Sequence, residues 1–157
     1  MSIKMYYKDE NDQFVEVSQS GVEISGALPV STTHNGKDGD IQTVQLYLKN
    51  SSAVKWYSNI VITPIDVVDA NPYGDVIYTE TGWGVKLSSG ATEPSSGEWE
   101  DIIWGEEINM DNIGTESLAD TSTYFPFWYL ITCPPNEDAK NKSDIFIKVR
   151  ATENAVI

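Results

Sequence analysis

Residues 43–64 read TVQLYLKNSSAVKWYSNIVITP, and this stretch decides the fold class. From Val44 to Leu48 every second residue is apolar, which is the two-residue period of a strand with one buried and one solvated face. The polar residues 50–52 supply turn chemistry, and a second, mostly apolar run follows and ends at Pro64. The stretch therefore predicts a β-hairpin of two long, half-buried strands.

Short strands separated by turns are predicted along the rest of the chain as well. The clearest lie at residues 76–79, 83–87, 124–132 and 145–149. Pro126 within the third of these implies an edge position or a bulge, because proline cannot donate to a ladder. No segment keeps a 3.6-residue apolar period over a helical length, although residues 94–99 suit one capped helical turn as well as a loop.

This arrangement predicts an all-β fold, an immunoglobulin-like or jelly-roll-like antiparallel β-sandwich with an N-terminal arm. A chain of 157 residues is expected to form a single domain, residues 1–157. Residues 41–157 carry the regular strands of the sandwich body. Residues 1–40 hold only short apolar pieces between polar residues, glycines and a proline, so they are interpreted as an arm or as edge strands.

The chain is strongly acidic, with a formal net charge of −14. Residues 66–120 carry 13 acidic residues and one basic residue, Lys86. Such a charge repels phosphate groups and argues against nucleic acid or an anionic membrane as the partner. The acidic half is interpreted as a solvated face, with docking on a basic partner as the alternative.

The residue types needed for catalysis or metal binding are scarce. The one histidine, His34, and the one cysteine, Cys133, lie about a hundred positions apart in sequence, so neither a catalytic triad nor a zinc site is expected. Residues 35–40 and 109–114 combine Asp, Asn and Gly, but neither has EF-hand spacing, and turns use the same residues. We therefore predict no enzyme activity, no cofactor and no metal. No signal peptide or membrane span is recognised either.

The tryptophans offer an alternative function. A carbohydrate-binding sandwich presents exposed indole rings to sugars, and the candidates for such a role are Trp83, Trp99 and Trp104. Nearby carboxylates at Glu98, Glu100 and Glu106 also raise the possibility of a glycosidase. Catalytic pairs usually face each other across a cleft, whereas these carboxylates lie in one local segment, so the enzyme is the weaker alternative.

Several short phrases together resemble one class of protein. They are STTHNGKDGD (31–40), LYLKN (46–50), GWGVKLS (82–88), PSSGEW (94–99), YFPFW (124–128) and the strand at 144–149. Over residues 31–153 the chain resembles accessory structural proteins of tailed bacteriophages, which are small β-sandwich proteins of the virion head or tail. The resemblance implies a protein that is synthesised in the bacterial host cytoplasm and located in the virion.

The resemblance also implies a function and partners. The function would be that of a non-enzymatic structural protein, a head decoration or cement protein ahead of a tail or baseplate component. Its partners would be major capsid or tail subunits and further copies of the chain, in a homo-oligomer or a multi-copy lattice.

A contact surface between subunits is predicted on the aromatic strand that begins at residue 124. More aromatic residues occur there than one buried strand face can hide, namely Tyr124, Phe125, Phe127, Trp128 and Tyr129. We expect these rings and the arm to contact neighbouring subunits, the arm by strand addition or by wrapping. On this hypothesis, deleting residues 1–30 abolishes assembly.

Overall fold

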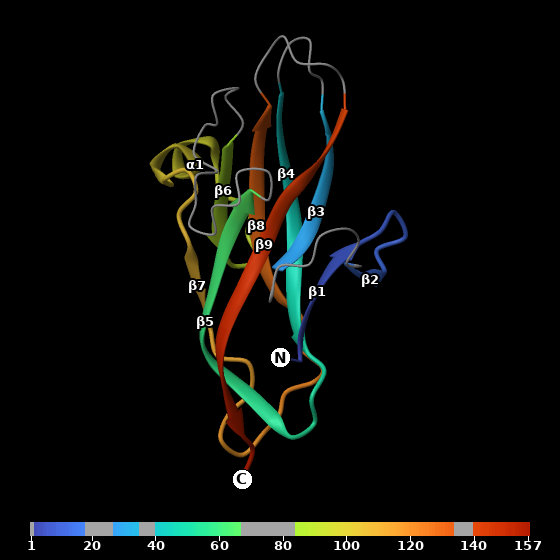
Figure 1. The fold of residues 1–157 in the computed structure, drawn as a ribbon, viewed down its shortest axis with the longest axis vertical. Helices are drawn as coiled ribbons and strands as arrows, with labels where there is room; N and C mark the ends of the chain where they lie inside the picture. The colour runs from blue at the N-terminus through green and yellow to red at the C-terminus, as the bar shows by residue number, and fades with distance from the viewer. Residues whose placement is uncertain (1, 18–26, 35–39, 67–83, 134–139) are drawn as a thin grey trace.

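The computed structural model describes residues 2–17, 27–34, 40–66, 84–133 and 140–157, and these residues form two antiparallel sheets (Figure 1). The five-stranded sheet has the order β2-β1-β4-β8-β6. Its strands are β1 (Ile3–Lys8), β2 (Phe14–Glu16), β4 (Asp40–Asn50), β6 (Gly84–Ser89) and β8 (Phe125–Cys133). The four-stranded sheet has the order β3-β9-β5-β7. Its strands are β3 (Ala27–His34), β5 (Lys55–Asp66), β7 (Ile108–Met110) and β9 (Lys140–Ala155).

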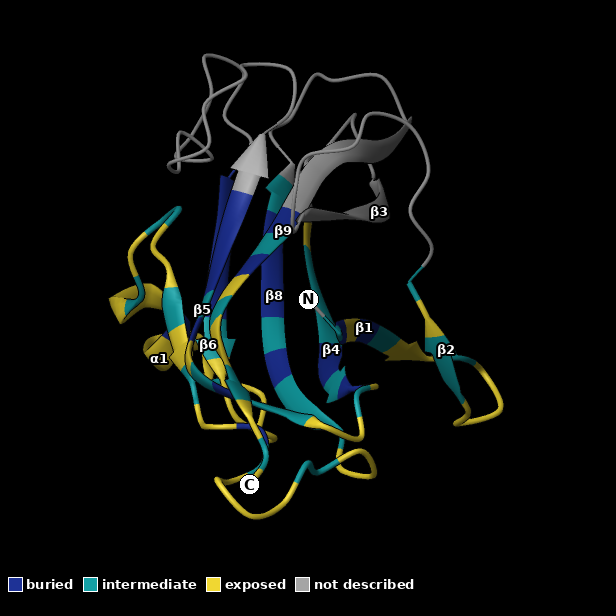
Figure 2. Ribbon diagram, turned by 60° about the horizontal axis from the view of Figure 1, so that its bottom comes forward, coloured by how far each residue is buried: buried dark blue, intermediate teal, exposed yellow. Residues whose placement is uncertain are grey.

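The core lies between the two sheets and is formed by buried residues of both, and Figure 2 shows where the buried residues lie along the strands. The most deeply buried residues of β1, β4 and β8 alternate along each strand, as the two-residue period requires, whereas β6 is buried on both faces from Gly84 to Leu87. The fully buried side chains come from both sheets and include Met5, Leu48, Tyr57, Ile60, Ile62, Leu87, Phe127, Tyr129 and Ile131. The predicted all-β antiparallel sandwich is confirmed.

The hairpin predicted at residues 43–64 is wrong, although both of its strands exist. β4 pairs with β1 and β8, whereas β5 pairs with β9 and β7, so the turn between them carries the chain from one sheet to the other. Asn50 stabilises this turn through hydrogen bonds of its side chain to the turn backbone. Its buried side chain accepts from the Ser52 N–H and donates to the carbonyls of Ser52 and Lys55. Alternation predicts which face is buried, but it does not say which strand is the neighbour.

The edge position or bulge inferred from Pro126 is also corrected. β8 is a central strand between β4 and β6, and its ladder with β4 runs in register through Pro126. The last pair between β6 and β8 is Ser89↔Phe127, so Pro126 lies one residue past the end of β6. Its carbonyl accepts from the Gly90 N–H at 3.2 Å, which places its nitrogen on the same side, where the β6 ladder has already ended. The missing N–H therefore costs no ladder bond.

The first 40 residues contribute strands to both sheets. β1 lies between β2 and β4 and buries Ile3 and Met5, so it belongs to the sandwich body. β2 and β3 are edge strands, one in each sheet. Residues 18–26 and 35–39 lie outside the described residues.

Residues 94–99, for which helix and loop were equally acceptable, contribute to a short helix, α1 (Ser96–Asp101). Ser95 and Glu98 form a capping box, in which the Ser95 side chain accepts from the Glu98 N–H and the Glu98 side chain accepts from the Ser95 N–H. The helix lies beside β6, at the opposite edge of its sheet from β2 (Figure 1).

Candidate interaction surface

The aromatic strand β8 divides its rings between the two faces of its sheet. Phe127 and Tyr129 are fully buried, and Phe125 packs against the core from a partly buried position. Tyr124 and Trp128 face the other way, on the outer face of the five-stranded sheet. One buried face does not hide all five rings, as expected: three of them belong to the core, and only Tyr124 and Trp128 lie on the outer face, where contact with a neighbouring subunit stays a prediction.

Trp128 is covered by the chain itself. Its indole N–H donates to the Ala91 carbonyl at 3.2 Å, and the Gln45 side chain donates to the same carbonyl at 3.1 Å. Two residues away on β4, the Thr43 hydroxyl donates to the Glu93 carboxylate at 2.7 Å. The segment that follows β6 therefore lies over the outer face of the sheet at β4 and β8.

The same segment is held at the β6 edge by a buried lysine. Lys86 is 7% exposed, and its ammonium donates to the Trp99 carbonyl at 2.7 Å. The ammonium also lies 4.4 Å from the centre of the Trp104 ring, a cation–π distance. Trp104 packs closely on Gly84, where an added Cβ would lie 2.8 Å from the ring. The Gly105 N–H donates to the Val85 carbonyl, which gives this backbone group of the edge strand β6 a hydrogen-bond partner.

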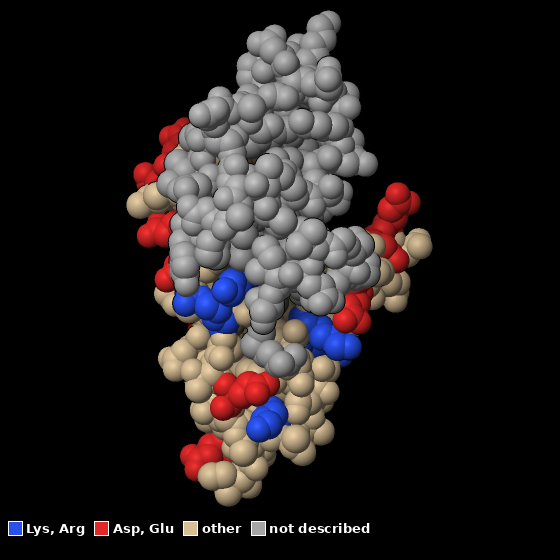
Figure 3. Space-filling model, viewed as in Figure 1, with Lys and Arg blue, Asp and Glu red and all other residues tan. Residues whose placement is uncertain are grey.

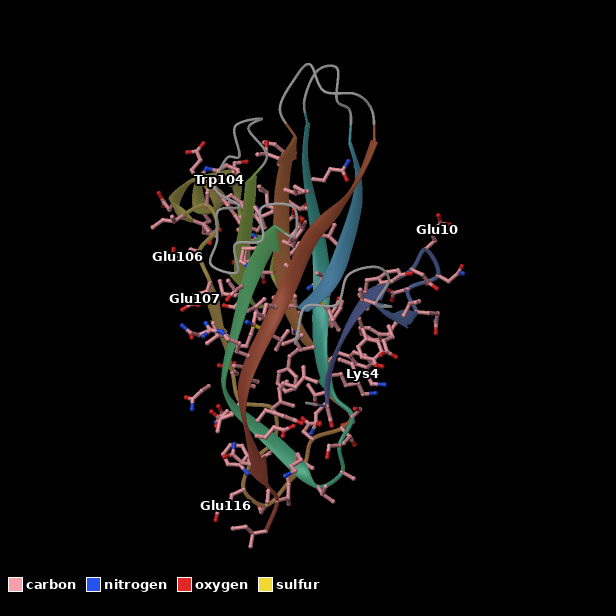
Figure 4. All side chains as sticks on the ribbon, in the orientation of Figure 1. Lys4, Glu10, Trp104, Glu106, Glu107 and Glu116 are labelled. Atoms are coloured by element: carbon pink, nitrogen blue, oxygen red, sulfur yellow. The ribbon has the colours of Figure 1, made fainter. Side chains whose placement is uncertain are left out.

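The tryptophans of the carbohydrate alternative do not form a stacking platform in the described residues. Trp99 is only 7% exposed, and the half-buried Trp104 packs on Gly84 of β6, close to α1 (Figure 4). Trp83 lies outside the described residues. The carboxylates of Glu98, Glu100 and Glu106 are exposed on α1 and the turn that follows it.

A second group of rings lies at the other end of the same outer face, and we call it the aromatic corner. It consists of Tyr6 on β1, Phe14 on β2, Tyr47 on β4 and Tyr124 immediately before β8. Phe14 and Tyr124 stack with centroids 3.6 Å apart and planes within 6°. Tyr6 meets Tyr124 edge-on at 5.2 Å, and Tyr47 meets Phe14 edge-on at 4.9 Å. Cross-strand register produces the group, because Tyr6 is paired with Tyr47.

Lysines surround the aromatic corner. Lys49 lies 4.6 Å from the Tyr124 ring centre, and its ammonium donates to the Tyr124 hydroxyl at 3.4 Å. Lys8 lies 5.1 Å from the Phe14 ring centre. Lys4, the cross-strand partner of Lys49, forms an ion pair with Glu16 at 3.5 Å. Figure 4 shows Lys4 beside β1, at the far edge of the sheet from Trp104.

A buried tyrosine anchors the start of β1 beneath this corner. The Tyr57 hydroxyl accepts from the Ser2 N–H at 3.0 Å and donates to the Glu153 carboxylate at 2.9 Å. Burial raises the pKa of Tyr57 above its usual 10.0, and the nearby Glu153 carboxylate raises it further, against a lowering contribution from the Ser2 N–H. The hydroxyl is therefore protonated at neutral pH and able to make both hydrogen bonds.

Sequence reasoning identified Tyr124 but missed Tyr6, Phe14 and Tyr47. Each of them is a single aromatic residue in a different strand, and nothing in its local sequence indicates that the others lie beside it. The available signal was alternation in β1, where Tyr6 follows the buried Met5 and so must face outward.

The described residues contain no group of three or more His, Cys, Asp or Glu side chains placed to bind a metal ion. Of the two loops considered for calcium, residues 35–39 lie outside the described residues, and the loop at 109–114 forms no such group. No helix in the described part of the chain is long and apolar enough to span a bilayer.

Comparisons with protein-family models, with curated proteins and with solved structures find no match to this chain.

Proposed function

We propose that the protein is a non-enzymatic accessory structural protein of a tailed-phage particle, a head decoration or cement protein before a tail or baseplate component. It works by contact with other protein subunits of the particle. The observation that carries the proposal is the aromatic corner, a four-ring cluster on the outer sheet face. Aromatic residues with a polar surround are typical of protein contact surfaces. The phage assignment itself rests on the sequence resemblance.

The location of the rings supports a contact role. Tyr6, Phe14 and Tyr124 are half-buried, and they lie on the sheet face that points away from the core. Elsewhere on that face the chain covers its own aromatic residue, Trp128, with the segment after β6. At the corner these three rings, which are as half-buried as Trp128, contact one another and the buried Tyr47. A partner subunit that covers the rings would remove apolar surface from water.

Point variants test this proposal better than removal of residues 1–30. That deletion removes Ile3 and Met5 from the core, so it tests folding and not assembly. Tyr6 and Tyr7 are a matched pair, because they are adjacent on β1 but face opposite sides of the sheet. Tyr7 is 39% exposed and takes no part in the ring cluster.

The experiment uses phage particles produced by cells that carry the gene for this chain. Mass spectrometry of purified particles should find the chain in stoichiometric proportion to a capsid or tail protein. Particles made with Tyr6→Ser should incorporate much less of it, whereas Tyr7→Ser should be incorporated normally. If the chain is absent from particles and remains in the soluble fraction, the proposal is wrong.

A further inference from the structure

We propose that the aromatic corner binds a second copy of this chain about a twofold axis, forming a dimer. The inference rests on the proposed function, because it names the partner of the same contact surface. It depends on the distribution of charged side chains around the rings.

The net charge of −14 restricts where two copies can meet. Copies of so acidic a chain repel one another wherever carboxylates dominate both surfaces. Carboxylates are dense along residues 93–107, where all six are exposed. Figure 3 shows acidic side chains along the α1 side of the molecule. A contact between copies is favoured only where lysines offset this repulsion.

The aromatic corner is such a place, because three of the ten basic residues surround it. Lys4 and Lys49 are direct cross-strand partners, and we call them the lysine base. Glu16 pairs with Lys4 at 3.5 Å, but no described carboxylate lies within ion-pair distance of Lys49. Two cations with one carboxylate leave the lysine base positive. Like charges directly opposite in a sheet are destabilising, which an approaching anion would relieve.

The turn between β1 and β2 carries the opposite charge. It contains Asp9, Glu10 and Asp12, which we call the acidic tip, and Figure 4 shows Glu10 at its end. The Asp9 carboxylate accepts from the N–H groups of its own turn, and Asp12 pairs with Lys8 at 3.3 Å. With one lysine for three carboxylates, the tip is negative.

The rings lie between these two charged regions. Along β1 the order is Lys4, then Tyr6, then Lys8 and the turn. The twofold axis lies between the ring clusters of the two copies, parallel to the sheet and perpendicular to β1. The second copy's β1 then runs in the opposite direction, so that each acidic tip lies against the other copy's lysine base. The contact surface is then self-complementary, as a twofold interface requires, with an aromatic centre and a charged rim. Each ion pair across the axis occurs twice.

The test is the molar mass of the purified full chain, measured by light scattering and sedimentation from about 1 to 100 µM. A dimer with a micromolar dissociation constant changes from mostly monomer to mostly dimer over this range. The wild type should be a dimer. Lys49→Glu reverses one charge of the lysine base and should weaken the dimer at least about tenfold, because two contacts are lost per dimer. Lys55→Glu is the control, since it makes the same change in net charge at the start of β5, outside the corner.

Two further measurements separate the contribution of the charged residues to dimer affinity from that of the aromatic rings. The difference between Lys49→Glu and Lys55→Glu should shrink at about 1 M salt, where exposed charges are screened. Tyr6→Ser should abolish the dimer at every salt concentration, and Tyr7→Ser should leave it intact. A wild-type monomer throughout the concentration range overturns the inference, as does equal weakening by the two lysine variants.

The two proposals fail in different ways. If the wild type is a monomer but Tyr6→Ser is still lost from particles, the twofold contact is wrong and the contact surface serves another virion protein. If the wild type is a dimer that Tyr6→Ser dissociates, yet the chain is absent from particles, the twofold contact is right and the phage function is wrong.

Discussion

The two edges of the five-stranded sheet differ in how deeply their aromatic side chains are buried. At the β6 edge the chain folds back over the sheet, so that Trp99 is buried and the Lys86 ammonium is held by a carbonyl and an indole ring. Toward the β2 edge the rings of Tyr6, Phe14 and Tyr124 are half-buried and surround the buried Tyr47. The comparison suggests that similar side chains, aromatic rings with lysines, stabilise the fold at one edge and are available to a partner at the other.

The largest expected difference between the edges concerns the removal of one aromatic ring from each. Trp99→Ala should lower the free energy of unfolding by about 3–5 kcal/mol, because a buried indole leaves a cavity. Phe14→Ala should cost only about 1–2 kcal/mol, since this ring is half-buried and loses mainly its contacts with neighbouring rings. Urea unfolding of both variants measures the difference. Equal losses would mean that the aromatic corner is as much part of the core as the β6 edge.

The anchor of β1 gives the next largest effect. Tyr57→Phe removes the hydroxyl that accepts from Ser2 and donates to Glu153, and it should cost about 1–2 kcal/mol at neutral pH.

This loss should depend on pH. The pKa of Tyr57 is raised in the folded state, so the stabilisation is complete below the unfolded value near 10 and is lost as the pH rises through the folded value. The advantage of the wild type over Tyr57→Phe should therefore shrink in alkaline solution. Thermal unfolding from neutral pH to above pH 10 measures it, and a constant difference would contradict the assignment.

The buried lysine at the covered edge has a smaller expected effect. Lys86→Met keeps most of the side-chain volume but removes the hydrogen bond to Trp99 and the cation–π contact with Trp104. The expected loss is about 1 kcal/mol, because the Trp99 carbonyl keeps a second donor in the Ile102 N–H. Lys55→Met, at a half-exposed lysine, is the control and should change the unfolding midpoint very little. If the two variants behave alike, Lys86 does not hold the segment.

The smallest effect is expected toward the β2 edge. Lys49→Glu should change the free energy of unfolding of the monomer by less than about 0.5 kcal/mol, because a surface charge contributes little to folding. Unfolding has to be measured at protein concentrations below the dissociation constant of the dimer, where the chain is a monomer. A loss of several kcal/mol there would show that Lys49 supports the fold, and the dimer test would then need Tyr6→Ser alone.

Much of the fold was predictable because burial follows local alternation. The core residues of β4, β6 and β8 lie where the two-residue period places them, although Tyr47, Lys86 and Leu130 are buried on the other face, and the capping chemistry of Ser95 and Glu98 marks the start of α1. The errors concern neighbours. The hairpin was wrong because the turn at Asn50 joins two sheets and not two strands of one sheet. The edge position inferred from Pro126 was wrong because the β6 ladder ends at Phe127, one residue short of Pro126, so that the missing N–H breaks no ladder bond.

The candidate site was less predictable than the fold. A surplus of rings near residue 124 was visible in the sequence, but their division between the faces depends on which side of β8 meets the core. The rest of the aromatic corner comes from β1, β2 and β4, and Tyr6 and Tyr124 are more than a hundred residues apart. Only the pairing of β1 with β4, and of β4 with β8, brings them together.

The sequence by itself determined the strand-rich class of this protein, the buried face of its clearest strands and its acidic character. These properties depend on composition and on neighbours two residues away, so they can be read locally. The tertiary structure decided which strands pair, which rings enter the core and where lysines meet rings on the surface. Those outcomes depend on register between distant segments, which is selected by how well two whole faces pack together.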